Sequence, residues 1–154
     1  MWSPEKAMNR LNKLPKLDPS VWDKQDVQRM SGDQRRTPFK GAQSASAGTL
    51  GHLLIDSMAE KYGSYNAALS HGKVKRVSLA SLRGLQAGVD AGKVAQKIRD
   101  LTESDEIDAA SVARYKGKQY LIDGNHTLTA LKLGGVRSVE AIVVNVLINM
   151  RRTR

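Results

Sequence analysis

The sequence predicts an α+β domain over residues 73–150, built as a small mixed β-sheet with packed helices. From residue 73 onward, β-branched stretches alternate with segments of helical period. Two short apolar strands flank Lys116-Gly117-Lys118, a pattern typical of a β-hairpin. At 154 residues the chain has room for one such domain and an appendage.

The first 48 residues are predicted to form a flexible or partner-dependent arm. All four prolines lie here, polar residues follow one another without an apolar period, and the small residues of 41–48 indicate a linker. A short helix is expected from Pro4 to Leu14. Such an arm commonly docks through side chains like Trp2 and Trp22, either onto its own domain or onto a protein partner.

Residues 49–72 are predicted to form a helical extension. Four apolar residues fall on one face at helical spacing, which predicts a helix from Leu50 to Tyr62. Thr49 is expected to cap this helix and Gly63 to end it. A further short turn is expected at Tyr65–Leu69. The four apolar residues are Leu50, Leu53, Leu54 and Met58.

The remaining elements follow from residue 73 in chain order. Val94, Ile98 and Leu101 recur at helical spacing behind Asp90, a candidate N-cap. Gly134-Gly135 is expected to stop the last helix. The predicted elements are a strand at Val74–Leu79, a helix at Ala91–Leu101, a solvated acidic connection at Thr102–Asp108, strands at Ser111–Tyr115 and Gln119–Ile122, a helix at Thr127–Leu133, and a strand at Val139–Ile148.

The charge balance favours a polyanionic partner. The chain carries 25 Lys and Arg against 15 Asp and Glu, a net charge of +10, and each phosphate that a basic side chain neutralises releases counterions. Nucleic acid, with DNA foremost, is therefore the expected partner; a well-solvated basic surface is the alternative. The longest apolar run, Ala141–Val144, is far shorter than the roughly 20 residues that span a membrane. No membrane partner is expected, and the predicted location is cytoplasmic.

The segment Asp123-Gly124-Asn125-His126-Thr127 carries the clearest chemical signal. An apolar strand ends at Asp123 and a helix follows at once, so unpaired N–H groups and the positive end of the helix dipole face the turn. Such a turn binds phosphate. Asp123 beside His126 is suited to orient the imidazole, to act as a base, or to hold a divalent metal such as Mg²⁺. The alternative is an ordinary Asp-Gly turn followed by ordinary helix capping.

The same segment resembles the Asp-Gly-X-His-Arg signature of the ParB-like nuclease and sulfiredoxin superfamily. Ile122 to His126 carry the match, followed by Ala130 and Gly134-Gly135. The resemblance continues in the right order over 73–148. The other matching segments are Val77–Leu82, Gln86, Lys93-Val94 and Val139–Val144.

The resemblance implies a ParB/sulfiredoxin-like fold and assigns site residues. The implied catalytic residues are Asp123, His126 and Gln86, with Asp123 as the metal ligand. The implied phosphate-binding residues are Gly124, Asn125, Thr127, Arg76 and Arg83.

Two features depart from the family pattern. Thr127 stands where the family has an Arg able to grip phosphate bidentately, so compensation is expected from Lys75, Arg76 or Arg83. No sequence remains after the last strand for the helix-turn-helix domain of partition proteins, so a stand-alone protein is expected. Sulfiredoxin chemistry is excluded because the chain has no cysteine.

Three functions follow as hypotheses. The first is a DNA nuclease that uses the Asp123–His126 segment with a divalent metal, of the kind that phages and mobile elements carry. The second is a nucleotide-binding phosphotransferase or NTPase, in which Glu103 or Asp105 activates the acceptor. The third is a non-catalytic DNA- or protein-binding module with a decayed active site.

Overall fold

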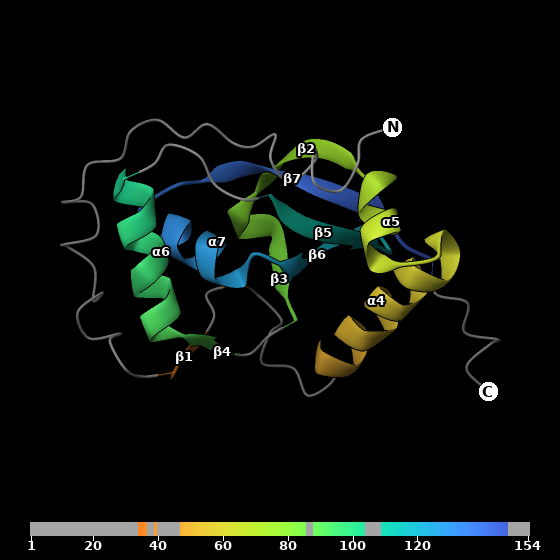
Figure 1. Ribbon diagram of the computed structural model, residues 1–154, viewed down its shortest axis with the longest axis horizontal. Coiled ribbons are helices and arrows are strands. Elements are labelled where there is room, and N and C mark those ends of the chain that lie inside the picture. Colours follow the sequence, from red (N-terminus) through yellow and green to blue (C-terminus); the bar gives the residue numbers. More distant parts are fainter. Residues whose placement is uncertain (1–33, 37–38, 40–46, 86–87, 104–108, 148–154) are drawn as a thin grey trace.

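The computed structural model describes residues 34–36, 39, 47–85, 88–103 and 109–147 (Figure 1). Four helices and two β-sheets make up this part of the chain. In chain order the elements are β1 (Gln34–Arg36), α4 (Ala47–Tyr62), α5 (Tyr65–Ser70), β2 (Lys73–Ser78), the 3₁₀ turn η1 (Leu79–Ser81), β3 (Leu82–Gly84), β4 (Gly88–Asp90), α6 (Ala91–Glu103), β5 (Ala110–Tyr115), β6 (Lys118–Asp123), α7 (Asn125–Leu133) and β7 (Ser138–Asn145).

The main sheet has five strands in the order β2-β7-β5-β6-β3. Its β7–β5 and β6–β3 pairs are parallel, whereas its β2–β7 and β5–β6 pairs are antiparallel. The predicted α+β class with a small mixed sheet is therefore confirmed. These directions give the sheet two ends. The loop end holds the ends of β2, β3 and β6 and the starts of β5 and β7; the hairpin end is the opposite one.

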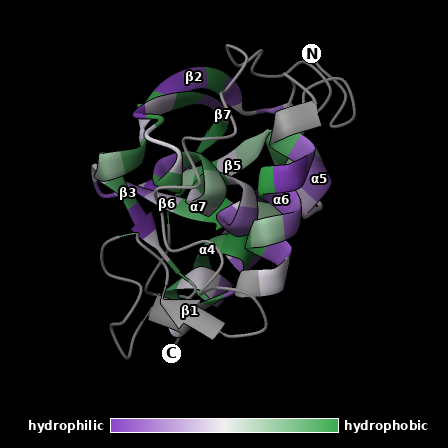
Figure 2. Ribbon diagram, turned by 90° about the vertical axis from the view of Figure 1, so that its left-hand side faces the viewer, coloured by the Kyte–Doolittle hydropathy of each residue, from purple (hydrophilic) through white to green (hydrophobic). Residues whose placement is uncertain are grey.

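Helices cover both faces of this sheet, with α6 and α7 on one face and α4 and α5 on the other (Figure 1). Successive residues of β7 show the arrangement, because Val143 belongs to the α6/α7 cluster while Ile142 and Val144 belong to the α4/α5 cluster. A strand that is buried on both faces has a continuous run of apolar residues in its sequence. In Figure 2 the edge strand β2 carries hydrophilic stretches, in keeping with its mostly exposed residues.

Within the described residues, the predicted helices and strands are found with shifted boundaries. The helix predicted at Leu50–Tyr62 begins at Ala47, so Thr49 lies inside it and the prediction that Thr49 caps it was wrong. The start of α4 also takes the last two residues of the predicted linker and arm. The last helix begins at Asn125 rather than Thr127, the last strand ends at Asn145, and the acidic connection begins after Glu103.

Part of the predicted arm packs on the domain. Strand β1 pairs antiparallel with β4, and Phe39 is buried in the α6/α7 cluster, where the Lys132 ammonium lies 5.6 Å from the centre of its ring. Trp2, Trp22 and the predicted helix at Pro4–Leu14 lie outside the described residues, so docking through these side chains stays a prediction.

Candidate functional site

The turn between β6 and α7 depends on Gly124. Its φ of +102° lies in the left-handed region that favours glycine. A Cβ at this position would lie 3.1 Å from the Cβ and 3.2 Å from the Cα of Ala110, at the start of β5. The Gly124 N–H donates to the Asp123 carboxylate over 2.9 Å. Both the backbone angle and the contact with β5 therefore select glycine here.

The first turn of α7 presents free donors. The first helical hydrogen bond runs from the Leu128 N–H to the Gly124 carbonyl (2.9 Å), and Gly124 has no side chain that could cap the helix. The backbone N–H groups of Asn125, His126 and Thr127 have no acceptor among the described residues, as expected for a first turn. No acidic residue lies in this turn. No side chain of the first turn therefore compensates the positive end of the helix dipole; the nearest carboxylate in the sequence is that of Asp123, which accepts the N–H of the N-cap residue Gly124.

His126 links the first turn of α7 to the start of α6. Its Nε2 accepts a hydrogen bond from the Asp90 N–H over 3.2 Å, so the proton of the neutral ring is on Nδ1. Burial is the main cause that lowers the pKa of His126; Lys93 and Lys97 lower it further, whereas Asp90 raises it. Asp90 also caps α6 by accepting the Lys93 N–H over 3.0 Å, which confirms the predicted N-cap. The imidazole is therefore held neutral beside two ammonium groups.

Asp123 faces a different set of groups. A β-bulge leaves Ile122 without a partner in β5, so Asp123 pairs with Ser111 instead of continuing the alternation of β6. The Ser111 hydroxyl is hydrogen-bonded to the Tyr65 hydroxyl of α5 (2.5 Å). Burial raises the pKa of Tyr65, the Ser111 hydrogen bond lowers it, and the charge of Asp123 raises it further. The bulge therefore turns Asp123 toward α5, away from the α6 side on which His126 is bonded.

Asn125 is buried, with 7% of its surface exposed. Its Oδ1 has no hydrogen-bond partner, whereas its backbone carbonyl accepts the Thr129 hydroxyl over 2.6 Å. A buried acceptor without a donor costs about 1–3 kcal/mol. The site therefore contains an oxygen that a hydrogen-bond donor would stabilise.

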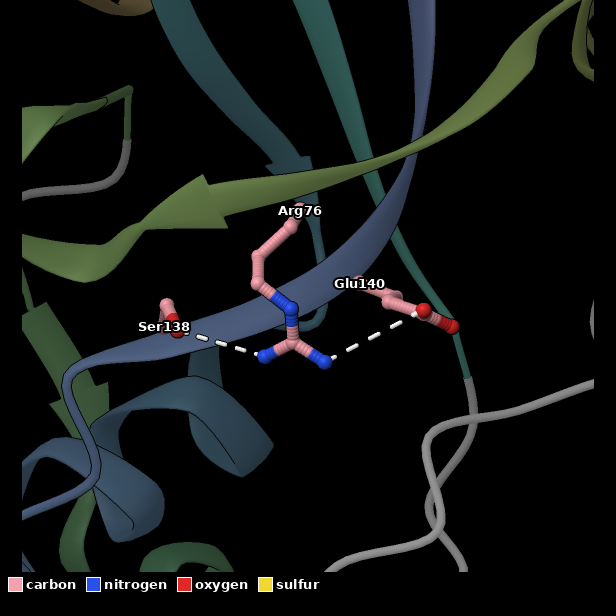
Figure 3. Close-up of polar contacts among 3 residues, drawn as sticks. All are labelled: Arg76, Ser138 and Glu140. Atoms are coloured by element: carbon pink, nitrogen blue, oxygen red, sulfur yellow. Dashed lines mark hydrogen bonds and ion pairs between the residues drawn. The ribbon is translucent and has the colours of Figure 1, made fainter.

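The two arginines that the resemblance assigns to phosphate lie on β2 and β3, and their role in phosphate binding stays a prediction. Arg76 is on β2, three strands from β6, and contacts Ser138 (3.2 Å) and Glu140 (3.9 Å), as Figure 3 shows. Arg83, on β3, is in register with Tyr120, three residues before Asp123. Gln86 lies outside the described residues, so its place in the site stays a prediction.

A separate open cleft of about 480 Å³ lies at the other end of α7. It combines an apolar floor with the cationic side chains of Lys132 and Arg137. The lining residues are Ser78, Leu79, Ala80, Lys132, Gly135, Val136 and Arg137.

The donor set does not fit a metal centre built from side chains alone. In the described part of the chain, no three His, Asp or Glu side chains gather as potential ligands. Asp123 accepts its neighbouring N–H and Asp90 caps α6, so each of these carboxylates has a structural role. A divalent metal bound through Asp123 stays a prediction. Within the described ranges, no helix has both the length and the apolar character needed to cross a membrane.

Comparisons with known proteins give one partial similarity. No family model and no solved structure matches the chain. Among curated proteins, the Transcriptional regulator NovG of Streptomyces niveus is 34% identical to it over 73 residues. These residues make up 47% of this chain and 23% of the relative, so the chain spans less than a quarter of that protein. Membership of the ParB/sulfiredoxin superfamily stays a prediction.

The sequence alone did not identify the partners of the two central side chains. Asp90 was predicted only as a helix cap. Lys93, Lys97 and Tyr65 were not linked to the turn. No local signal pointed to the His126–Asp90 contact, because Asp90 ends β4, a three-residue strand of the smaller sheet that was not predicted.

Proposed function

We propose that this chain binds DNA and that the first turn of α7 holds a phosphate of the DNA backbone. The observation that carries the proposal is the set of three backbone N–H groups without acceptors, at Asn125, His126 and Thr127, in a turn without acidic side chains. Helix starts of this kind favour bound phosphate through both hydrogen bonds and the dipole.

Charge and similarity favour DNA as the source of the phosphate. The net charge is +10, and exposed Lys93 and half-buried Lys97 act on His126 beside the turn. Phosphate contacts from cationic side chains and helix starts position a protein on DNA without reading its sequence. The partial similarity to a protein named as a transcriptional regulator agrees with this partner.

Binding is better supported than cleavage by the state of the two candidate catalytic groups. The Nε2 of His126 already accepts the Asp90 N–H, so it would have to leave this bond before accepting a proton from a nucleophile. Asp123 is turned toward Tyr65 and Ser111. The turn therefore does not bring His126, as a base, and Asp123, as the carboxylate that would orient it, within hydrogen-bond reach of each other.

A nucleotide is the second candidate ligand, and Asn125 is the reason. A phosphate supplies only acceptors to the free N–H groups, whereas the unpaired Oδ1 of Asn125 needs a donor. A sugar hydroxyl or a base amino group next to a phosphate provides that donor. Thermal-shift measurements with the four nucleoside triphosphates and Mg²⁺ test this candidate; an unchanged unfolding temperature with all four rules it out.

Three substitutions at Thr127 test the DNA proposal. Thr127→Glu places a carboxylate in the first turn of α7, where it stabilises the helix by about 0.3–1 kcal/mol but repels phosphate. Thr127→Gln is the neutral control of the same size, and Thr127→Arg supplies a guanidinium for phosphate. The proposal predicts that DNA affinity falls in the order Arg, Gln, Glu while the unfolding temperature of the Glu variant stays at or above that of the Gln variant.

Fluorescence anisotropy with a labelled duplex at several salt concentrations gives these affinities. One phosphate contact corresponds to about 0.9 in the slope of log affinity against log salt. Equal affinities of the Glu and Gln variants would refute phosphate binding at this turn. A nicking assay on supercoiled plasmid with divalent metals, run with wild type and His126→Ala, tests the nuclease hypothesis. If wild type nicks the plasmid and His126→Ala does not, the site cleaves DNA rather than only binding it.

A further inference from the structure

The hairpin end of the main sheet gathers exposed cations. Lys73 begins β2, Arg114 lies near the end of β5, Lys116 lies in the turn that follows, and Lys118 begins β6; all four are exposed. The strand pairings fix their placement, because Lys73 pairs with Val143 and Arg114 with Asn145 near the end of β7, while Lys118 pairs with Tyr115. Lys73 and Arg114 therefore start from the α6/α7 face of the sheet and Lys118 from the α4/α5 face, so the cations surround the hairpin end from both sides. We call these four residues the hairpin-end surface.

Carboxylates of the same strands do not neutralise this surface. The strands β2, β5, β6 and β7 contain two acidic residues, Asp123 and Glu140. Asp123 ends β6 at the loop end, and Glu140 is near the start of β7, where it pairs with Arg76. The acidic and basic side chains of these strands are therefore separated along the strand direction, which leaves a positive potential at the hairpin end.

Aromatic rings beside the surface are in contact with cations. The Lys116 ammonium lies 5.2 Å from the centre of the Tyr115 ring. On the neighbouring helix α4, the Lys61 ammonium lies 5.2 Å from the Tyr62 ring, which stacks on His71 with 4.7 Å between ring centres. Cation–π contacts fix the ammonium positions. Because one face of the Tyr115 ring is taken by an ammonium, the surface offers mainly charges for a phosphate backbone.

The width of the surface matches a duplex groove. Lys73 and Lys118 lie on strands separated by three strand spacings in the order β2-β7-β5-β6, which amounts to about 14 Å across the sheet. Lys73 is level with Val112, three residues before the Tyr115 that pairs with Lys118, so the two lysines are also offset by about 10 Å along the strands. The major groove of B-DNA is about 12 Å wide, so flexible lysines at this spacing reach phosphates on both sides of it. A surface that contacts only the backbone carries no sequence preference of its own.

We propose that the hairpin-end surface is a second DNA-binding surface, which contacts the phosphates of duplex DNA through Lys73, Arg114, Lys116 and Lys118. It lies at the opposite end of the sheet from the turn at Gly124. The proposal therefore goes beyond the proposed function, and either can fail without the other.

A charge-removal triple variant tests the surface in the full chain. Lys73→Gln, Arg114→Gln and Lys118→Gln remove three charges from it, whereas Arg76→Gln, Arg99→Gln and Arg137→Gln remove three exposed charges elsewhere as the matched control. Anisotropy with a labelled duplex should show an affinity loss on the order of tenfold for the first variant at about 0.1 M salt, with a salt slope smaller by about 2–3. The control variant should lose much less DNA affinity. Thermal unfolding of both variants checks that each is folded.

Three outcomes would overturn the proposal. Equal losses in the two triple variants would show that only net charge matters, and an unchanged affinity of the first would show that the surface makes no contact. A loss confined to a single-stranded oligonucleotide would exclude duplex DNA as the partner. The Thr127→Glu variant distinguishes the two proposals. If Thr127→Glu loses DNA affinity while the first triple variant keeps it, the turn binds DNA and the hairpin-end surface does not.

Discussion

Replacing Gly124 by Ala tests the geometry on which the candidate site depends. A side chain at the φ of +102° is strained, which costs about 1–3 kcal/mol. The added Cβ would also lie 3.1 Å from the Cβ of Ala110, and such overpacking costs about 1–3 kcal/mol. In the middle of these ranges the two costs add, so the free energy of unfolding falls by about 4 kcal/mol and the unfolding temperature by roughly 8–16 °C.

Matched substitutions separate the two causes. Gly117→Ala meets a similar φ of +76°, but its Cβ would have no atom within 4 Å, so it carries only the backbone strain and should cost about 1–2 kcal/mol. Gly124→Ala should cost less in an Ala110→Gly background than in wild type, because one of the two close atoms is gone. Urea denaturation of the single and double variants measures these differences. Equal losses for Gly124→Ala and Gly117→Ala, or an additive double variant, would refute the contact.

Two further predictions concern His126 and Phe39. Because the fold lowers the pKa of His126 below 6.5, its contribution to stability is present above pH 6.5 and is lost as the pH falls through the folded-state pKa. The free energy of unfolding of wild type, measured in urea from pH 7 to pH 5, should therefore fall more steeply than that of His126→Gln; parallel curves would contradict this. Phe39→Ala should lower the free energy of unfolding by about 3–5 kcal/mol, because the ring is 4% exposed in the core. A loss below about 1 kcal/mol would place this residue outside the cooperative unit.

The spacing of apolar residues along the sequence was sufficient to predict the longer helices and strands. Val94, Ile98 and Leu101 were placed on one face of a helix, and all three are buried in the core. The three-residue strands β1, β3 and β4 were not predicted, because so short a segment shows no alternation and is fixed by its pairing partners.

The turn at Gly124 was predicted, but the side chains acting on it were only partly predicted. A strand that runs into a helix across Asp-Gly is a local pattern. The hydrogen bond between His126 and Asp90 joins residues 36 positions apart, and the bulge that turns Asp123 toward Tyr65 depends on the register of two strands. Neither leaves a local signal. The sequence therefore placed Asp123 and His126 in one pocket, whereas the fold gives them different partners.

The free N–H groups of Asn125, His126 and Thr127 are the central feature of the proposed function, and their backbone amide signals report on it most directly. We propose recording ¹H–¹⁵N correlation spectra of the full chain during titration with a short DNA duplex. The account predicts that the amide signals of these three residues shift together and saturate with the anisotropy curve. Shifts confined to other parts of the chain, with these three amides unchanged at saturation, would contradict it.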